Sequence, residues 1–555
     1  MNEKIVIYQI LTRLYGNRNT TRKENGTIEE NGCGKMNDLT TAVLKRIRGY
    51  GMTHVWYTGI IRHATQTDYS SYGIPRQHPA VVKGRAGSPY AITDYYDVDP
   101  DLAVNVEKRM QEFQQLIDRT HKAGLKVVID FVPNHVARQY KSICKPSNVK
   151  QDLGEGDDQQ QGFSMQNNFY YCPGQQFSPY FDLYHGEMEP YEEMPAKATG
   201  NDCFHNAPGQ NDWYETVKLN YGVDYYAGVT PSSFHLTPNT PTPNTWSKML
   251  EILLFWASKG VDAFRCDMAE MVPAEFWAWA TKQVKKQYKN IKFIGEVYNP
   301  AEYRHYIASG FDYLYDKVGM YDTLREVIRG NRSTHDISFA WQQTDDIRQH
   351  MLYFLENHDE QRIASDFFAA DGMKALPALV TMALLEQNPI MIYAGQEYGE
   401  RGMDREGFSG NDGRTTIFDY WSIDSLVRAS ARKLTQNEKL LFSYYKLVLY
   451  IATHSEAVRA GLMFDLMYAN GHLHRQYAFL RKKGSERLLV VANFENHPSE
   501  IDLYLPAHAF DYMKLHEGKT TAQDLLTGES LKIELKADSP LHLTIGANTA
   551  LVLDF

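Results

Sequence analysis

Acidic and histidine side chains gather in four short segments of the sequence, each at or just after the end of an apolar run. The segments are 127–135 (VVIDFVPNH), 260–271 (GVDAFRCDMAEM), 293–297 (FIGEV) and 354–359 (FLENHD). Cleavage of a glycosidic bond uses such groups: one carboxylate attacks or stabilises the sugar carbon, and a protonated carboxyl donates to the leaving oxygen. If the four segments converge in the fold, their side chains are therefore suited to this reaction.

Each of these residues also has a purely structural interpretation when it is taken alone. A lone Asp after a strand is often a helix N-cap or a loop ligand. Arg265 can simply neutralise Asp267, and His135 or His358 can be hydrogen-bonded residues of the core. The functional interpretation is favoured only when all four segments end at the same edge of one sheet.

The surrounding pattern predicts such a sheet, because short apolar runs alternate with amphipathic helical segments. Eight strands are expected at 5–10, 54–58, 126–131, 261–265, 291–295, 311–315, 351–356 and 390–393. Helices are expected near 37–50, 104–123, 245–258, 274–289, 300–308, 321–330, 372–386 and 435–452. This alternation is typical of an α/β fold of the (β/α)8 TIM-barrel type, in which catalytic groups follow the carboxyl ends of the strands. The four segments fall on strands three, four, five and seven.

Two stretches depart from the alternation. Nearly ninety residues without a clear helix, 137–225, are too many for an ordinary connection, and we expect an inserted irregular subdomain after strand three. From about 459 to 555 the pattern has period two with turn signals, which predicts a C-terminal antiparallel β-sandwich domain. The barrel itself then comprises 1–136 and 226–458.

The composition excludes several classes of function. The 555 residues carry 58 Lys and Arg against 68 Asp and Glu, a net charge of −10, which argues against a nucleic-acid partner. Aromatic residues make up 13% of the chain, which suits either sugar stacking or an ordinary Tyr-rich core. No charge or composition feature indicates an organic cofactor, and a neutral substrate is compatible with all of them.

Cysteine usage and apolar stretches bear on the compartment. The five cysteines are irregularly spaced and form no CxxC pair, so neither a disulfide framework nor a structural zinc site is indicated. The longest nearly apolar stretch, about 375–385, is interrupted by Pro377 and is too short to span a bilayer. The chain as written shows no signal-peptide pattern, so we expect a cytoplasmic protein without membrane insertion, with secretion as the alternative if a leader has been removed.

The four segments resemble, in order, the four signature regions of the α-amylase family of glycoside hydrolases and transglycosylases. Three further segments are similar to that family: 6–10 (VIYQI) to its first strand, 88–95 (SPYAITDY) to the stretch before its second helix, and 392–397 (IYAGQE) to its eighth-strand motif. The inserted subdomain and the trailing β domain stand where this family carries its domains B and C. The resemblance therefore covers nearly the whole chain.

The resemblance implies a role for individual residues. Asp267 corresponds to the nucleophile, Glu296 to the general acid/base, and Asp359 to the aspartate that grips hydroxyls of the sugar being cleaved. The family's sugar-binding positions, and the arginine that orients the nucleophile, correspond to Tyr90, His135, Arg265 and His358. The implied mechanism is a double displacement through a covalent glycosyl-enzyme intermediate, with retained α configuration.

Two features of the sequence bear on how the substrate and a metal ion would be bound. Many members carry a Lys-His pair, commonly in contact with the leaving-group sugar, where this chain has Glu270 and Met271. Asn134 matches a calcium ligand of many members, together with a main-chain carbonyl near 271 and an aspartate of the inserted subdomain. The candidate aspartates are Asp152, Asp157, Asp158 and Asp202. Calcium binding and a merely solvated acidic loop both remain open interpretations.

Three functions are compatible with the sequence. The leading hypothesis is hydrolysis of α-1,4-glucosidic bonds in maltooligosaccharides or starch-type α-glucans. The second is transglycosylation, in which a sugar hydroxyl instead of water resolves the intermediate. The third is an inactive glucan-binding or transporter-accessory protein, which the retained Asp267, Glu296 and Asp359 argue against. The sequence does not indicate an oligomeric state.

Overall fold

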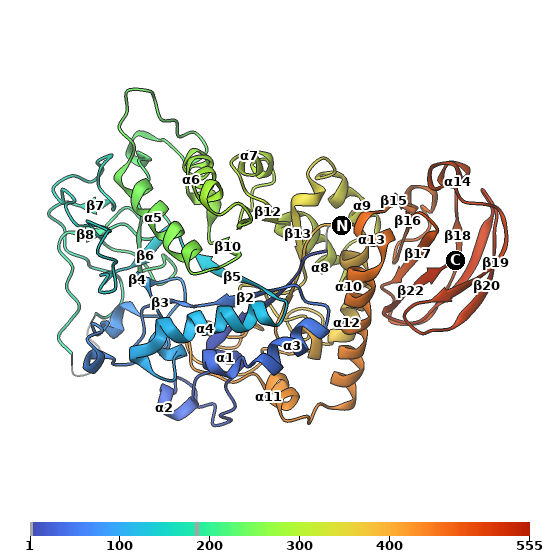
Figure 1. The fold of residues 1–555 in the computed structure, drawn as a ribbon, viewed down its shortest axis with the longest axis horizontal. Coiled ribbons are helices and arrows are strands. Elements are labelled where there is room, and N and C mark those ends of the chain that lie inside the picture. The colour runs from blue at the N-terminus through green and yellow to red at the C-terminus, as the bar shows by residue number, and fades with distance from the viewer. Residues whose placement is uncertain (1–3, 184–187) are drawn as a thin grey trace.

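The computed structural model describes residues 4–183 and 188–555 and contains a closed barrel of eight parallel strands (Figure 1). Strand β1 pairs with both β2 and β14, which closes the ring. The barrel strands are β1 Val6–Leu11, β2 His54–Thr58, β5 Lys126–Phe131, β10 Ala263–Cys266, β11 Lys292–Gly295, β12 Tyr313–Tyr315, β13 Met351–Phe354 and β14 Ile390–Tyr393. The predicted eight-stranded barrel is confirmed.

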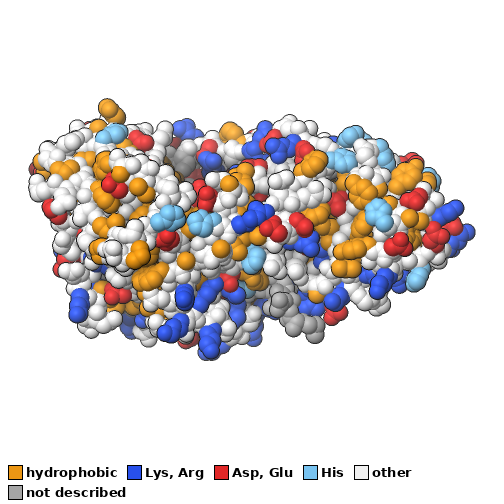
Figure 2. Space-filling model, turned by 90° about the horizontal axis from the view of Figure 1, so that it is seen from above, with side chains coloured by type: hydrophobic (Ala, Val, Ile, Leu, Met, Phe, Trp, Pro, Cys, Tyr) orange, Lys and Arg blue, Asp and Glu red, His pale blue; other side chains and the backbone are white. Residues whose placement is uncertain are grey.

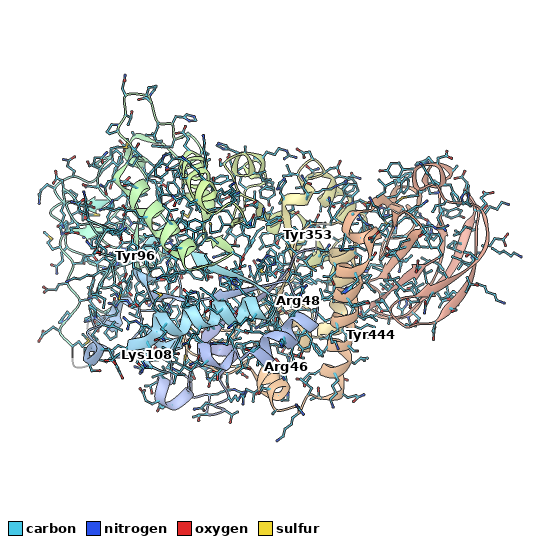
Figure 3. The ribbon with its side chains drawn as sticks, viewed as in Figure 1. Arg46, Arg48, Tyr96, Lys108, Tyr353 and Tyr444 are labelled. Atoms are coloured by element: carbon cyan, nitrogen blue, oxygen red, sulfur yellow. The ribbon has the colours of Figure 1, made fainter. Side chains whose placement is uncertain are left out.

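Side chains of alternate strand residues separate into two packed layers. Those that point inward fill the barrel interior, and Ile7, Val128 and Leu352 belong to this inner cluster. Their neighbours point outward against the helices, as Tyr353 of β13 does; it is completely buried there and is labelled in Figure 3. Because successive side chains of a strand face opposite sides, a strand buried on both faces is largely apolar. The strands are therefore mostly apolar runs in the sequence, and buried polar residues such as Asp130 of β5 and Arg265 of β10 are exceptions near their carboxyl ends.

Helices surround the barrel and cover the outward-facing layer (Figure 1). They include α3 Thr41–Gly49, α4 Arg109–Lys122, α5 Asn244–Ser258, α6 Ala274–Gln287, α7 Tyr303–Ala308, α8 Asp322–Ile328, α10 Leu376–Leu384 and α12 Gln436–His454. Each lies in a segment where the sequence predicts a helix. The start of α12 shows why: Thr435 and Glu438 form a capping box that satisfies N–H groups of its first turn. None of the described helices is both long and apolar enough to cross a membrane.

The segment between β5 and α5 forms an irregular layer over the carboxyl end of the barrel strands. It contains short strand pairs: β6 His135–Ala137 with β9 Thr216–Lys218, and β7 Tyr171–Cys172 with β8 Ala196–Lys197. Within the described part of 138–243 the structure has no α-helix. The β6–β9 pairing matters most for the site, since it places His135 directly opposite Lys218.

The C-terminal region forms antiparallel sheets beyond α10 and α12, at the opposite end of the molecule from β7 and β8 (Figure 1). A six-stranded sheet has the order β15-β16-β17-β22-β19-β20, and β18 pairs with β21. The bounds are β15 Leu462–Asp465, β16 Gln476–Lys483, β17 Glu486–Asn493, β18 Ser499–Tyr504, β19 Gly518–Asp524, β20 Ser530–Leu535, β21 Pro540–Ile545 and β22 Thr549–Asp554. The predicted antiparallel β domain is confirmed. It also contains a helix, α14 Ala507–Met513, that the period-two pattern did not predict.

The outer surface has no single dominant charge on the face that Figure 2 shows. Lys and Arg side chains are interspersed with Asp and Glu along the length of the molecule. This distribution agrees with the modest net charge of −10. A continuous basic stripe, the usual mark of a nucleic-acid-binding face, is not seen on this side.

Candidate active site

The three carboxylates singled out by the sequence meet at one cavity of about 340 Å³. Asp267 follows β10, Glu296 follows β11, and Asp359 lies five residues beyond the end of β13. The parallel ladder continues one step past the strand ends, because the N–H of Asp267 donates to Phe131 O (2.9 Å) and the N–H of Glu296 to Cys266 O (3.1 Å). Backbone pairing therefore fixes both acidic residues at the barrel mouth. Tyr90 and His135 also line this cavity.

Arg265 holds two of these carboxylates at once. Its Nη1 lies 2.7 Å from Oδ1 of Asp267, and its Nη2 lies 2.7 Å from Oε2 of Glu296. The guanidinium is 1% exposed and lies over the rings of Trp56 and Tyr90. Only the contact with Asp267 was expected from the sequence. The Nη1 contact with Asp267 is a hydrogen bond, whereas Nη2 makes a charge contact with Glu296 without hydrogen-bond geometry. One cation between two carboxylates attracts both and so holds them near each other.

Glu296 receives two further contacts from its surroundings. The N–H of Met268 donates to Oε2 at 2.8 Å, and the hydroxyl of Tyr298 donates to Oε1. Met268 adopts a left-handed backbone conformation with φ of +43°, which is uncommon for a residue with a Cβ. This strained turn, directly after Asp267, aims its N–H at Glu296. Such strain is typical of residues held in place by a functional site.

Glu270 anchors the loop that carries Tyr298. Its Oε2 accepts the backbone N–H groups of Tyr298 (2.8 Å) and Asn299 (3.0 Å). The side chain is thus committed to the protein itself and is half-buried. An anion suits this task, because it accepts two N–H donors, whereas a Lys at this position could accept none. The departure at position 270 therefore has a structural consequence within the site.

Tyr90 and His358 form a hydrogen-bonded and stacked pair beside the carboxylates. Tyr90 Oη lies 2.6 Å from His358 Nε2, and the rings are 5.2 Å apart with an interplanar angle of 24°. The Gln9 amide lies 2.7 Å from His358 Nδ1, and Asp359 Oδ2 lies 3.1 Å from Nε2. Among the described residues, His358 and Arg265 are not part of the cavity lining. His358 therefore lies behind Tyr90 and Asp359, where it orients both.

His135 differs from His358 in lining the cavity directly. Its ring centroid lies 5.4 Å from that of Trp213, a residue of the inserted segment. Burial, together with the nearby charges of Lys218 and Lys83, lowers the pKa of His135 to about 3. The imidazole is therefore neutral at ordinary pH. In that form one ring nitrogen donates and the other accepts, which suits contact with a sugar hydroxyl.

Burial dominates the electrostatics of the acidic residues. The pKa of Asp267 is raised well above that of an ordinary aspartate by burial and by the charges of Glu296, Asp359 and Asp130, against the opposing effect of Arg265. Partial removal from water also raises the pKa of Asp359, whose side chain keeps 41% exposure, and Arg265 and Arg414 oppose this shift. A group of acidic side chains crowded into one cavity, with perturbed pKa values, is a common property of catalytic sites.

The position that the sequence offers as a calcium ligand is taken up by a lysine. The Lys218 ammonium donates to Oδ1 of Asn134 at 2.8 Å and lies 2.6 Å from Oδ1 of Asp202. Its side chain is 1% exposed. A calcium ion bound to Asn134 and Asp202 would have to occupy the volume of this ammonium group, and the two cations would repel each other. The residues present do not fit a calcium ion at this position.

Several residues of the site were not foreseen from the sequence. They are Tyr298 after β11, Lys83 before β4 (Ile92–Val98), and Trp213, Glu215 and Lys218 of the inserted segment. Tyr298 had a usable signal, because it lies two residues beyond Glu296 and so continues the alternation of a strand end. The others come from irregular stretches, where no periodicity relates sequence position to the barrel mouth.

Comparison with known proteins agrees with this architecture. The chain matches the α-amylase catalytic domain over residues 9–452 and the α-amylase C-terminal all-β domain over residues 469–555. It is 22% identical over 464 residues to α-amylase 3 of Dictyoglomus thermophilum, a match that covers 79% of this chain and 81% of that protein.

Other relatives carry different names within the same group. A cyclomaltodextrin glucanotransferase of Geobacillus stearothermophilus is 22% identical to this chain over 71% of its residues. The match covers 49% of the length of that enzyme, so the chain spans about half of it. The crystal structure of a maltogenic α-amylase from Thermotoga neapolitana has the same fold, with a TM-score of 0.62 and 19% identity over 100% of this chain and 98% of that one. The chain thus belongs to the α-amylase family of glycosidases.

Proposed function

We propose that this enzyme hydrolyses α-1,4-glucosidic bonds of maltooligosaccharides or starch-type α-glucans with retention of configuration. The observation that carries the proposal is the single guanidinium of Arg265, which contacts Asp267 and Glu296 at 2.7 Å each beside one cavity. Retaining glycosidases place their two carboxyls about 5–5.5 Å apart. Two carboxylates that share one guanidinium are compatible with that spacing.

In the proposed mechanism Asp267 attacks the anomeric carbon while Glu296 protonates the departing glycosidic oxygen. The bond to the leaving sugar breaks as the bond to Oδ of Asp267 forms. In the second step Glu296, now ionised, takes a proton from water, and the water oxygen displaces Asp267 from the same carbon. Two inversions give net retention, and Glu296 recovers its proton for the next turnover.

The remaining site residues would bind and orient the sugar. Asp359 would accept hydroxyls of the sugar being cleaved, and the Tyr90 ring would stack on its apolar face. Neutral His135 would hydrogen-bond the same sugar from the cavity wall. We assign His358 a positioning role, since it contacts Tyr90 and Asp359 from behind.

Transglycosylation is a second candidate for the same chemistry. This candidate is supported by the similarity of the chain to a cyclomaltodextrin glucanotransferase, because the name of that relative denotes glucan transfer. The first step is identical in both reactions, and only the acceptor of the glycosyl group differs. The inactive alternative has no comparable support, because the three carboxylates are present and share one cavity.

A time course with defined substrates tests the proposal. The purified protein is incubated with maltotriose, maltoheptaose, starch, pullulan and trehalose, and the products are resolved by chromatography. We expect shorter maltooligosaccharides as products, and proton NMR of the earliest product should show the α anomer. Oligomers longer than the substrate would favour transfer instead. A first-formed β anomer would overturn retention, and no turnover of any α-1,4 substrate would overturn the activity.

We further propose that the protein uses no calcium at Asn134 and that Lys218 supplies the positive charge there. The ammonium joins Asn134, next to the cavity residue His135, to Asp202 of the inserted segment. A calcium ion at this place would link the same two parts through oxygen ligands. The lysine achieves this link with a covalently attached cation, which neither dissociates nor responds to chelators.

A further inference from the structure

Lys83 and Glu215 form an ion pair on the wall of the cavity that contains Asp267 and Glu296. Lys83 Nζ lies 3.0 Å from Oε1 of Glu215, and both residues line the cavity. They are nearly buried, at 8% and 4% exposure. The pair joins separate parts of the chain, because Lys83 precedes β4 (Ile92–Val98) whereas Glu215 immediately precedes β9 in the inserted segment. The mechanism proposed above uses neither residue.

Glu215 has hydrogen-bonding capacity that the protein leaves unused. Its Oε2 is buried and accepts no hydrogen bond from any residue that the structure describes. An unpaired buried carboxylate oxygen destabilises the fold, so such groups in native proteins call for a functional explanation. Since Glu215 borders the cavity, a hydroxyl of a bound ligand is a donor that can approach its carboxylate.

Trp213 adds an aromatic surface at the same wall. Its backbone has φ of +46°, a conformation that is strained for a bulky residue. This turn places its ring 5.4 Å from that of His135, and Trp213 lines the cavity together with Glu215. Aromatic faces pack against the C–H faces of sugars. Strain that presents such a ring to the cavity therefore points to a ligand with an apolar face.

We propose that Lys83, Trp213 and Glu215 form a subsite that binds the hydroxyl groups of a glucosyl residue beside His135. The inference rests on the proposed function and extends it to the residues that hold the substrate. An ion pair has no net charge, so it favours a neutral ligand. It offers both an acceptor and a donor, and vicinal sugar hydroxyls can donate to Glu215 while accepting from Lys83.

Binding to a catalytically disabled protein tests this subsite without turnover. All variants are made in the Asp267→Asn background, and titration calorimetry measures the Kd for maltotriose. Glu215→Ala and Trp213→Ala should each weaken binding about tenfold or more, since each removes a direct ligand contact. Glu215→Gln keeps the shape and one acceptor, so its loss should be smaller. Lys83→Met should weaken binding in the same direction as Glu215→Ala.

Lys292→Met is the matched control. It removes the ammonium of another ion pair, Lys292–Asp312 (2.9 Å), and neither residue lines this cavity. Its Kd should stay within about twofold of the background protein. Circular dichroism checks that each variant is folded; where Glu215→Ala is not, Lys83→Met and Trp213→Ala decide the question.

The outcomes separate this inference from the proposed function. Binding of maltotriose that is equally tight in the Lys83, Trp213 and Glu215 variants would overturn the subsite and leave the proposed function intact. Failure of the Asp267→Asn protein itself to bind maltotriose or maltoheptaose would overturn the proposed function, and the subsite with it. Weakened binding in the three variants, with the control unchanged, is the result we expect.

Discussion

Glu270 and Tyr298 are joined by a hydrogen bond of 2.8 Å, in which the backbone N–H of Tyr298 donates to Oε2 of Glu270. The Tyr298 hydroxyl in turn donates to Glu296. A residue that interrupts the family pattern in the sequence is thus connected, through one loop, to the proposed proton donor. Glu270 is a positioning residue in this account, and it is not placed to contact the reacting atoms itself.

Glu270→Ala should therefore lower kcat more than it raises KM. Without its carboxylate the two N–H groups of the loop lose their acceptor, and Tyr298 is no longer held against Glu296. We expect a fall in kcat of about tenfold, measured with maltoheptaose. Glu270→Gln, which keeps one acceptor oxygen, should recover part of this loss. Equal kinetics for Glu270→Ala and the parent enzyme would contradict the positioning role.

The pH dependence of activity should reflect the crowded carboxylates. Attack requires ionised Asp267, and burial with neighbouring negative charges raises its pKa. As the pH falls through this raised pKa, the nucleophile becomes protonated and kcat/KM is lost. The acid limb should therefore lie above pH 4, where an ordinary aspartate titrates (pKa about 3.9). A limb at or below pH 4 would contradict the raised pKa.

Asp130→Asn should move that acid limb to lower pH. Asp130 is one of the charges that raise the pKa of Asp267, and burial raises the pKa of Asp130 itself to about 6, so its removal makes ionisation of Asp267 easier chiefly above that pH. Asp316→Asn is the control, because Asp316 is equally buried but is not among these charges. We expect a downward shift of the limb for the first variant only. Shifts of the same size in both would show that the effect is not electrostatic.

Much of this arrangement could be predicted from the sequence, and the reason is the regularity of the barrel. Strands β5, β10, β11 and β13 are apolar runs, and each carries its acidic residue at or beyond its carboxyl end, so periodicity alone brings Asp267, Glu296 and Asp359 together. The C-terminal domain was predicted less well, because the period-two pattern over 459–555 gave no indication of the helix α14.

The contributions of the inserted segment could not be predicted in the same way. Trp213, Glu215 and Lys218 lie in an irregular stretch, and their positions depend on the β6–β9 pairing and on a strained backbone turn. Lys218 illustrates the difficulty best. A lysine in a polar stretch suggests a solvated surface residue, yet tertiary contacts with Asn134 and Asp202 bury it almost completely.

Chelators should have no effect on stability or activity if Lys218 replaces calcium. We expect the same Tm and kcat with 5 mM EDTA as with 5 mM CaCl2, and no stoichiometric calcium by elemental analysis of the purified protein. Lys218→Met should lower the Tm, because it leaves the buried Asn134 carbonyl oxygen without its donor. Asp202 is 36% exposed and stays hydrated, so the expected cost is about 1–3 kcal/mol. Lys197→Met, which removes a partly exposed lysine of the same segment, is the control. Loss of activity in EDTA that calcium restores would contradict this interpretation.

The loss of activity caused by Glu296→Gln should depend on the leaving group of the substrate. A poor leaving group needs protonation as the bond breaks, whereas an activated aryl glycoside does not. We expect a fall in kcat/KM of about 1,000-fold or more on maltotriose and a much smaller fall on the dinitrophenyl maltoside. Equal losses on both substrates would mean that Glu296 is not the proton donor.

The covalent intermediate provides the most direct test of the account. The Glu296→Gln protein is incubated with a 5-fluoro-α-glucosyl fluoride, whose good leaving group allows attack while the intermediate forms faster than it is hydrolysed. Intact-mass spectrometry followed by peptide mapping then locates the adduct. We predict one fluoroglucosyl group per chain, attached to Asp267, and none on the Asp267→Asn protein. Turnover without an adduct, or an adduct on Asp359 or any other residue, would contradict the assignment of Asp267 as the nucleophile.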